Sequence, residues 1–261
     1  MQTASSHQSR LGRFLFLLLL ALLPGSRLAA QAVKVAVAAN AQFVVEALRK
    51  AFKAESGTDL EPIVSSSGKL TAQIRNGAPF EVFLSADTKY PDELHKAGFA
   101  AQAPKVYAYG SLVLWGREKR DLPQNLGFLT GPAIARIAVA NPRLAPYGEA
   151  AVQALAYYKL YPRVEKKLVF GENIAQVNQY VLSGAAPVGF TAKSVVLDPA
   201  TGGKGAWVEV DRKAYRPIAQ SVVLLKKGKS AGAREFYRFL SGHTAKAIFR
   251  KYGYLTESPE N

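Results

Sequence analysis

The chain has 261 residues, of which 49% are hydrophobic and 20% charged, a balance typical of a globular protein with one or two domains. It contains no cysteine, which excludes disulfide bonds, cysteine-ligated metals and a thiol nucleophile, and its three histidines are too few for a multi-histidine metal site in one subunit. The formal net charge of +15 could attract anions or nucleic acid, but the basic residues are scattered without interleaved aromatics, which favours a solvated surface.

Residues 1–32 have the pattern of an export signal. Two arginines precede the apolar run 14–23, a Pro-Gly-Ser break follows the run, and residues 30–32 read Ala-Gln-Ala, a cleavage motif. The run is shorter than the roughly 20 apolar residues that a membrane-spanning helix needs. We therefore predict a signal peptide that is cleaved after Ala30 or Ala32; a retained N-terminal anchor is the alternative.

From residue 33 onward, strand and helix patterns alternate, which predicts an α/β fold. The first predicted helix shows its periodicity most clearly, because Phe43, Ala47 and Ala51 recur at four-residue spacing and Ser56-Gly57 supplies a C-terminal cap. In this first part of the mature chain we expect strands at 35–40, 60–64 and 80–85 and helices at 41–56, 69–76 and 90–96.

Two long β-rich runs, 106–115 and 218–225, bracket a self-contained α/β block. The economical arrangement is two lobes between which the chain crosses twice, which makes a hinge and a cleft for a small ligand. Within the block we expect strands at 134–140, 168–170 and 188–191 and helices at 149–160 and 174–182, and after it helices at 231–240 and 244–252. The predicted divisions are a signal peptide 1–32, lobe one 33–110 plus 219–256, lobe two 111–218, and a tail 257–261.

Three predicted strands end in small or polar residues shortly before a helix. These ends are Asn40, the segment Ser65-Ser66-Ser67-Gly68, and Asn141, after which the chain leads through Pro146-Tyr147-Gly148 into a helix. A helix start exposes unpaired backbone N–H groups and the positive end of the helix dipole, so it suits an anion. Each feature alone also fits an ordinary role, with Asn40 as a cap or a donor, the serines as an N-cap, and Tyr147 as a packing aromatic.

Other polar residues favour structural roles. Asp87 follows a strand and is expected to cap a turn or helix rather than to act as a catalytic acid. Tyr157 and Tyr158 resemble the adjacent tyrosines that hold ferric ion in some exported proteins, but they fall in an amphipathic helix and are expected to pack. His95 and His243 lie on predicted helices among charged residues, and no G-x-S-x-G motif is present, so an exported hydrolase is the less favoured alternative.

Six segments, in this order and spacing, carry a family resemblance. They are Val37-Ala38-Ala39-Asn40, Ser65-Ser66-Ser67-Gly68-Lys69-Leu70, residues 77–87, residues 137–142, Pro146-Tyr147-Gly148 and residues 248–254. Together they resemble the periplasmic molybdate-binding proteins of ABC transporters, over nearly all of the mature chain. Each segment alone is a weak signal, and the specificity lies in their order.

The resemblance implies a type II periplasmic binding protein, with two Rossmann-like lobes joined by a double-crossing hinge. It implies an exported, monomeric protein that closes on molybdate or tungstate and delivers it to a membrane ABC permease, with no enzymatic chemistry and no cofactor. The oxyanion would be held by hydrogen bonds, without a direct bond from the protein to the metal. A binding protein for another tetrahedral oxyanion, such as sulfate or phosphate, is the alternative.

The resemblance also implies a set of ligand residues. Ala192 occupies a position where some members of the family have a tyrosine, so Tyr147 is expected to supply the missing phenol. Carried over residue by residue, the ligands are Asn40 with the Ala39 backbone, Ser67 with Ser66 as the other register, Tyr147, and the backbone of Ile174.

None of these positions carries a carboxylate. An all-donor pocket suits molybdate, tungstate and sulfate, which are fully deprotonated near neutral pH, whereas phosphate keeps a proton and is better served by a carboxylate acceptor. Molybdate and sulfate are alike in charge and shape, so the choice between them must depend on the size of the pocket. The sequence leaves that size open.

Overall fold

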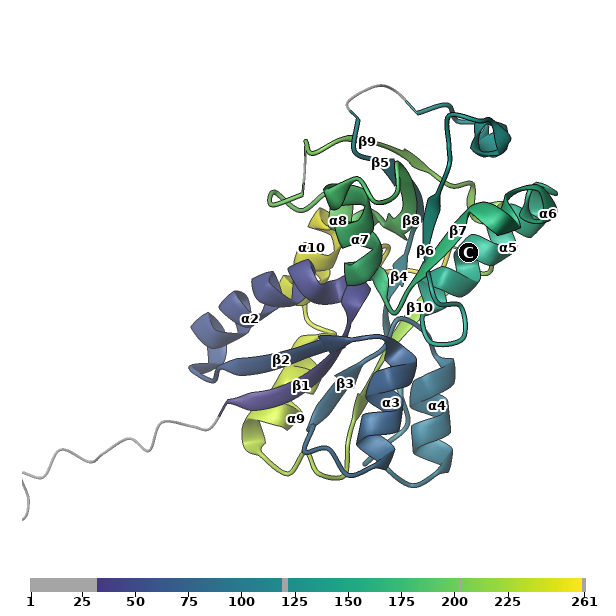
Figure 1. The fold of residues 1–261 in the computed structure, drawn as a ribbon. Coiled ribbons are helices and arrows are strands. Elements are labelled where there is room, and N and C mark those ends of the chain that lie inside the picture. Colours follow the sequence, from purple (N-terminus) through teal and green to yellow (C-terminus); the bar gives the residue numbers. More distant parts are fainter. Residues whose placement is uncertain (1–31, 119–121, 202, 260–261) are drawn as a thin grey trace, which may run out of the picture. The chain divides into compact units, whose positions relative to one another are not determined.

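The structure is a computed structural model that describes residues 32–118, 122–201 and 203–259 (Figure 1). The predicted signal peptide, apart from its last residue, lies outside the described residues. Within the described ranges, none of the helices has both the length and the apolar character needed to cross a membrane.

The first sheet contains the strands from both ends of the mature chain, in the order β2-β1-β3-β10-β4. Strand β1 pairs in parallel with β2 and β3, while β10 runs antiparallel to both of its neighbours. The bounds are β1 Val33–Ala38, β2 Leu60–Ser65, β3 Val82–Leu84, β4 Lys105–Gly110 and β10 Ile218–Leu224. We call this sheet and the helices packed on it lobe one.

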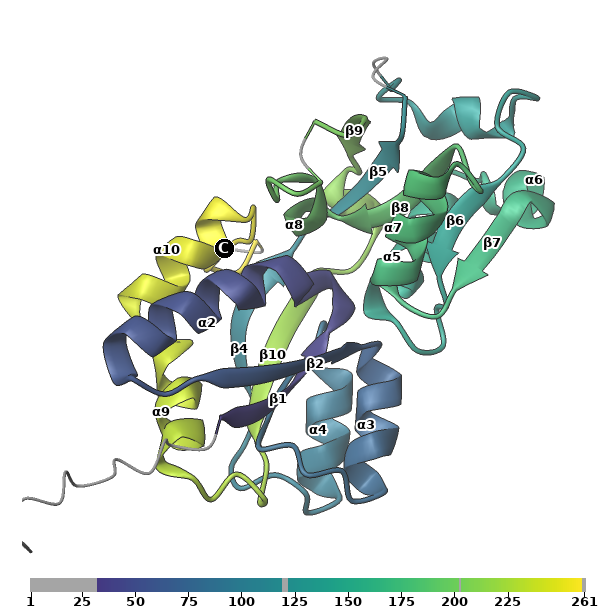
Figure 2. The same ribbon diagram turned by 60° about the vertical axis from the view of Figure 1, so that its left-hand side comes forward.

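Alternating side chains of β1 face two different cores, as expected for a strand buried on both faces. Val35 and Val37 belong to the cluster formed with the long helix α2 and with α9 and α10, whereas Ala36 belongs to the cluster formed with α3 and α4. Figure 2 shows α2 and the pair α3 and α4 on opposite sides of this sheet. The bounds are α2 Gln42–Ser56, α3 Ser67–Arg75, α4 Lys89–Lys96, α9 Ala231–Phe239 and α10 His243–Lys251.

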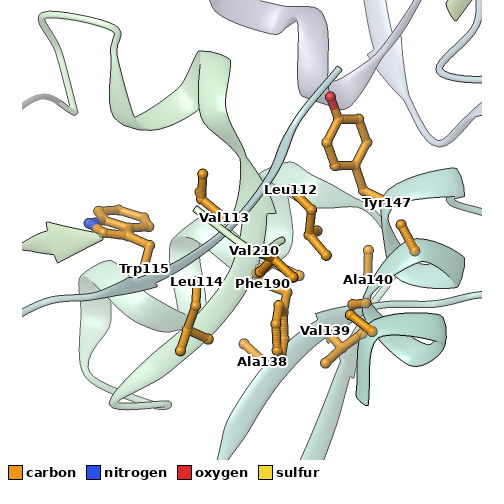
Figure 3. Packing of buried hydrophobic residues seen from close by; sticks show 14 of the residues in the cluster. Leu112, Val113, Leu114, Trp115, Ala138, Val139, Ala140, Tyr147, Phe190 and Val210 are labelled. Carbon is orange, nitrogen blue, oxygen red and sulfur yellow. The ribbon is translucent and has the colours of Figure 1, made fainter. Parts of the chain in front are cut away.

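The second sheet has the order β7-β6-β8-β5-β9 and is built from the middle of the chain. Strand β6 pairs in parallel with β7 and β8, and β5 runs antiparallel to β8 and β9. Its buried side chains form one large apolar cluster with the flanking helices, part of which is seen in Figure 3. We call this unit lobe two; its main elements are β5 Leu112–Gly116, β6 Ile137–Ala140, α5 Pro146–Tyr157, β7 Leu168–Gly171, α7 Ile174–Ser183, β8 Val188–Ala192 and β9 Ala206–Glu209.

The chain passes between the two sheets at two places. Ser111 alone separates β4 from β5, so the predicted single run 106–115 is in fact two strands in different sheets. The return passage lies between Glu209 and Ile218 and contains the 3₁₀ turn η4 (Arg212–Ala214). The two mixed sheets with flanking helices confirm the predicted α/β fold class with two lobes.

Several short elements differ from the prediction. Helix α5 begins at Pro146 rather than at residue 149, because proline is well suited to the first turn of a helix. The edge strand β9 was not predicted, since it is only four residues long and its sequence shows no clear alternation of apolar and polar residues. The remaining short elements are η1 Ala39–Ala41, η2 Leu126–Thr130, α6 Tyr161–Val164, η3 Glu165–Lys167 and α8 Lys193–Val196.

Candidate functional site

One small cavity between the lobes is lined by all six residues of the predicted ligand set. Its free volume is about 10 Å³. Lobe one contributes the end of β1 with the turn η1, the start of α3 and the second residue after β3, while lobe two contributes the starts of α5 and α7. The lining residues are Ala38, Ala39, Asn40, Ser66, Ser67, Ala86, Ala145, Pro146, Tyr147, Asn173 and Ile174.

The first edge of the cavity is the turn η1, which follows β1 directly. Ala39 and Asn40 are the first two residues of this 3₁₀ turn, so its geometry leaves their backbone N–H groups without a partner inside the turn. The Asn40 side chain is held within lobe one, because its Nδ2 donates to Gln220 Oε1 at 2.9 Å and to the Tyr254 hydroxyl at 3.2 Å. The donors that this segment offers to the cavity are therefore main-chain groups.

The second edge is the serine segment at the start of α3. Ser66 is the N-cap, and its Oγ accepts a hydrogen bond from the backbone N–H of Lys69 at 3.4 Å. Ser67 is the first helical residue and is 1% exposed; its Oγ accepts from the backbone N–H of Ala86 at 3.1 Å. That bond uses an oxygen lone pair, so the Ser67 hydroxyl hydrogen is left to be donated to an acceptor in the cavity.

Lobe two supplies two further helix starts. Tyr147 is the second residue of α5, and its hydroxyl accepts from Gln220 Nε2 at 3.1 Å. Burial raises the pKa of the Tyr147 phenol well above its ordinary value, so the phenol keeps its hydrogen at neutral pH. Ile174 begins α7 behind the cap Asn173, whose side chain accepts from the N–H of Gln176, and the Ile174 N–H has no partner inside the helix.

The electrostatics of the cavity come from neutral groups. Among the residues that line it, none carries a charged side chain. The helices α3, α5 and α7 all begin at the cavity, and each start carries the positive end of a helix dipole. The arrangement is therefore suited to a small anion that only accepts hydrogen bonds.

Several polar contacts join the lobes around the cavity, in addition to the hydrogen bond between Gln220 and Tyr147. The Gly68 N–H donates to the Leu144 carbonyl at 3.0 Å, and the Tyr90 hydroxyl donates to the Arg143 carbonyl at 3.0 Å. At the outer rim, the Lys69 ammonium lies 3.1 Å from the Glu172 carboxylate. Contacts of this kind exist only when the lobes are close, so they favour the closed form.

The Lys69–Glu172 pair predicts two charge variants with opposite effects on anion binding. Lys69→Gln leaves the negative charge of Glu172 uncompensated near the cavity. Glu172→Gln leaves the positive charge of Lys69 uncompensated there. We expect the first to weaken and the second to strengthen the binding of a divalent oxyanion, each by about two- to fivefold, because both groups are partly exposed and screened. Titration calorimetry at low and high salt measures both; equal weakening by both variants would show that the pair acts only as a clamp between the lobes.

Asp87 lies next to the cavity wall and serves as a turn cap, as predicted. Its Oδ1 accepts from the Tyr90 N–H at 3.3 Å and from the Ser85 hydroxyl at 2.8 Å. Burial raises the pKa of the Asp87 carboxyl to about 6, and the nearby Glu149 adds to this, while the hydrogen bonds and Lys89 act in the opposite direction.

The raised pKa of Asp87 predicts a pH-dependent contribution to stability. Because the folded-state value lies above the ordinary one, this group's contribution is fully present below about pH 4 and is lost as the pH rises through about 6. Asp87→Asn should therefore raise the free energy of unfolding at pH 7.5 by about 1–3 kcal/mol, with no gain below about pH 4. Urea unfolding at several pH values measures this; Asp92→Asn, at an exposed position of the helix α4 that follows Asp87, is the control and should change little.

The other residues considered from the sequence do not line the cavity. Tyr157 and Tyr158 are 57% and 38% exposed and pack edge to face against each other at the end of α5. His95 lies near the end of α4 and His243 begins α10. Ala192 is fully buried at the end of β8. In the described part of the chain, no group of three or more His, Asp or Glu side chains is arranged to hold a metal ion.

Sequence reasoning missed two buried residues beside the site. Gln220 contacts Asn40 and Tyr147, and Tyr254 contacts Asn40. Gln220 has a signal in hindsight, because it is an amide within a mainly apolar strand run. Tyr254 belongs to one of the segments that carry the resemblance, but neither residue has a spacing that links it to the distant strand ends.

Two α/β lobes that the chain crosses twice, with a donor-lined cavity between them, define a two-lobed solute-binding protein. The chain belongs to the family of bacterial extracellular solute-binding proteins, whose sequence model matches residues 33–255. This confirms the type II binding-protein fold expected from the resemblance.

Similar proteins agree with this assignment. The molybdate-binding protein ModA of Rhodobacter capsulatus is 38% identical over 242 residues, covering 91% of this chain and 94% of the relative. That of Azotobacter vinelandii is 40% identical over 232 residues, covering 87% and 91%. The solved structure of the A. vinelandii periplasmic molybdate-binding protein superposes with a TM-score of 0.83 at 33% identity, covering 87% of this chain and all of that one.

Proposed function

We propose that this protein captures molybdate outside the cytoplasm and delivers it to a membrane ABC permease. The observation that carries the proposal is the cavity between the lobes, which is lined by neutral hydrogen-bond donors and by no charged side chain. Relatives that are 38% and 40% identical over most of their length are named molybdate-binding proteins, which supports the choice of ligand.

The donor set supports a fully deprotonated tetrahedral dianion. The Ser67 hydroxyl, whose oxygen already accepts from the Ala86 N–H, has its hydrogen left to donate, as has the Tyr147 phenol. The backbone N–H groups of Ala39, Asn40 and Ile174 can only donate. A proton on the ligand, as on phosphate near neutral pH, would face donors instead of an acceptor, and that mismatch costs free energy. Sulfate matches the charge pattern and must be excluded by size.

Binding is proposed to work by closing the hinge. An anion that accepts from Ser67 of lobe one and from Tyr147 or Ile174 of lobe two binds the closed form more tightly than the open one, which is the differential affinity that a switch needs. The protein would act as a monomer and carry out no chemistry, and the permease would recognise its closed form. Tungstate, similar to molybdate in charge and geometry, is proposed as a second ligand.

Tyr147 is also proposed to replace the phenol that is missing at Ala192. Its ring is 2% exposed and its hydroxyl is directed toward lobe one, where it meets Gln220. A buried phenol that already reaches across the cleft can supply the donor that some relatives take from the end of the neighbouring strand. Molybdate binding should therefore weaken in the variant Tyr147→Phe. The wild type should bind molybdate without a tyrosine at position 192.

Two proposals about the chain itself follow from the sequence. We propose cleavage of the signal peptide after Ala30 or Ala32 and lobe divisions at 33–110 plus 219–256 and at 111–218, with 257–261 as a tail. The sheet membership of β4, β5 and β10 supports the divisions. N-terminal sequencing of the secreted protein tests the cleavage site.

Calorimetric titration of the apo protein with molybdate, tungstate, sulfate and phosphate tests the proposed function. We expect tight binding of molybdate and tungstate with a stoichiometry of one, and much weaker binding of sulfate and phosphate. Sulfate binding as tight as or tighter than molybdate binding would contradict the proposal and favour the alternative of a binding protein for another tetrahedral oxyanion.

A further inference from the structure

A buried network of side-chain hydrogen bonds lies behind the cavity, at the place where the two lobes join. At its centre is Gln220, which is completely buried on β10, two residues after the chain returns to lobe one. Its Oε1 accepts from Asn40 Nδ2 and from the Tyr107 hydroxyl, each at 2.9 Å, and its Nε2 donates to the Tyr147 hydroxyl at 3.1 Å.

The backbone is shaped to place this amide. The register between β10 and β4 shifts at Gln220, so that Gln220 pairs with Ala108 and Ser221 pairs with Val106. Tyr107 is thus the extra residue of a β-bulge, and bulges commonly redirect a side chain. At the bulge the Tyr107 hydroxyl donates to the side chain of Gln220 on the neighbouring strand.

The space around the amide is equally restricted. A Cβ atom at Gly110 would lie 1.9 Å from the Tyr147 hydroxyl and 2.6 Å from Gln220 Nε2, so only glycine permits the phenol to reach the amide. Figure 3 shows the Tyr147 ring at the edge of the apolar cluster of lobe two, with its hydroxyl directed away from Ala140 and Phe190.

The direction of its hydrogen bonds allows the Gln220 amide to influence which groups donate into the cavity. Gln220 Oε1 already accepts two hydrogen bonds, so its Nε2 is the group turned toward Tyr147 and the phenol oxygen must accept. A phenol that accepts from Nε2 keeps its own hydrogen for another acceptor. The same amide fixes the side chain of Asn40, whose backbone N–H borders the cavity.

We propose that Gln220 is a positioning residue for the anion site: it orients the Tyr147 hydroxyl as a donor toward the cavity and ties that phenol of lobe two to Asn40 of lobe one. The proposal rests on the proposed oxyanion-binding function and adds a residue to it that does not line the cavity. Gln220 acts through Tyr147 and Asn40, and its hydrogen bond to Tyr147 forms only when the lobes are close.

The test is a double-mutant cycle with molybdate as the probe. In Gln220→Glu the new carboxylate can still accept from Asn40 and Tyr107, but it can no longer donate, so the phenol turns its hydrogen away from the cavity. We expect a loss of affinity of roughly 30-fold by titration calorimetry. In the Tyr147→Phe background the same substitution should cost at least fivefold less, because no phenol remains to be redirected and only the added charge acts.

Ser221→Ala is the matched control, since Ser221 follows Gln220 on β10 and its buried hydroxyl donates to the Asp87 carbonyl instead of contacting the amide. We expect it to lower the thermal unfolding temperature while leaving the dissociation constant within about twofold. The proposal is overturned if the folded Gln220→Glu variant binds molybdate within about twofold of the wild type. It is also overturned if the substitution lowers the molybdate affinity equally in the wild-type and Tyr147→Phe backgrounds. If the wild type itself does not bind molybdate, the proposed function fails instead.

Discussion

Replacing Ser67 with alanine is expected to weaken molybdate binding about 10- to 100-fold, because a buried hydrogen bond to a charged group contributes about 1.5–3 kcal/mol. The substitution removes a side-chain hydroxyl that borders the cavity with its hydrogen available to the ligand, and it also removes the acceptor for the Ala86 N–H. Titration calorimetry with molybdate at pH 7.5 and moderate salt measures the change.

The neighbouring serine provides a control of the same size and chemistry. Ser66 caps α3 by accepting from the Lys69 N–H, so Ser66→Ala should lower stability by about 0.5–2 kcal/mol and change binding much less than Ser67→Ala does. The reverse pattern, with loss of binding in Ser66→Ala and none in Ser67→Ala, would show that the ligand serine is in the other register.

Replacing Gly148 with alanine is expected to disturb both folding and binding. An added Cβ atom would lie 2.0 Å from the carbonyl oxygen of Ala140 and 2.7 Å from its carbonyl carbon, which are backbone atoms of β6 and cannot rotate away. The start of α5 must therefore move off the strand end, and the phenol of Tyr147 moves with it. We expect a loss of at least about 2–3 kcal/mol of stability, as for other overpacked sites, together with a loss of molybdate affinity of at least tenfold.

Gly116→Ala is the matched control for this prediction. Gly116 also lies in lobe two, and an added Cβ atom there would have its nearest neighbours at 3.4 Å, which is close to ordinary contact. We expect it to bind molybdate normally and to unfold within about 1 kcal/mol of the wild type. Normal binding by a well-folded Gly148→Ala protein would contradict the view that the start of α5 is part of the site.

The predicted fold class was confirmed because strand and helix periodicity is a local property. The residues at strand ends could also be named in advance, since Asn40, Ser67 and Tyr147 each follow a strand within a recognisable segment. Their meeting at one cavity depends on which strands share a sheet, and the sequence signals that only through the order of the segments. Their role as ligands remains a prediction.

What could not be predicted depends on contacts between distant segments. Gln220 is 180 residues from Asn40 in the chain, and their hydrogen bond exists only because β10 returns to the first sheet. The split of the run 106–115 at Ser111 is likewise a tertiary effect, because both halves have the same β-forming composition. Helix starts such as that of α5 were misplaced by a few residues, as expected where a proline-containing turn merges into a helix.

The residues that line the cavity also suggest how its selectivity could change during evolution. Four of them are alanines, namely Ala38, Ala39, Ala86 and Ala145, whose methyl groups set the free space while backbone groups and few side chains hold the charge. Replacing one of these alanines with glycine or with a larger apolar residue would change the size of the anion that fits the cavity. The net charge and the number of hydrogen-bond donors would stay the same. A lineage could thus move between oxyanions of different size by single small substitutions, with the electrostatic framework of the helix starts kept intact.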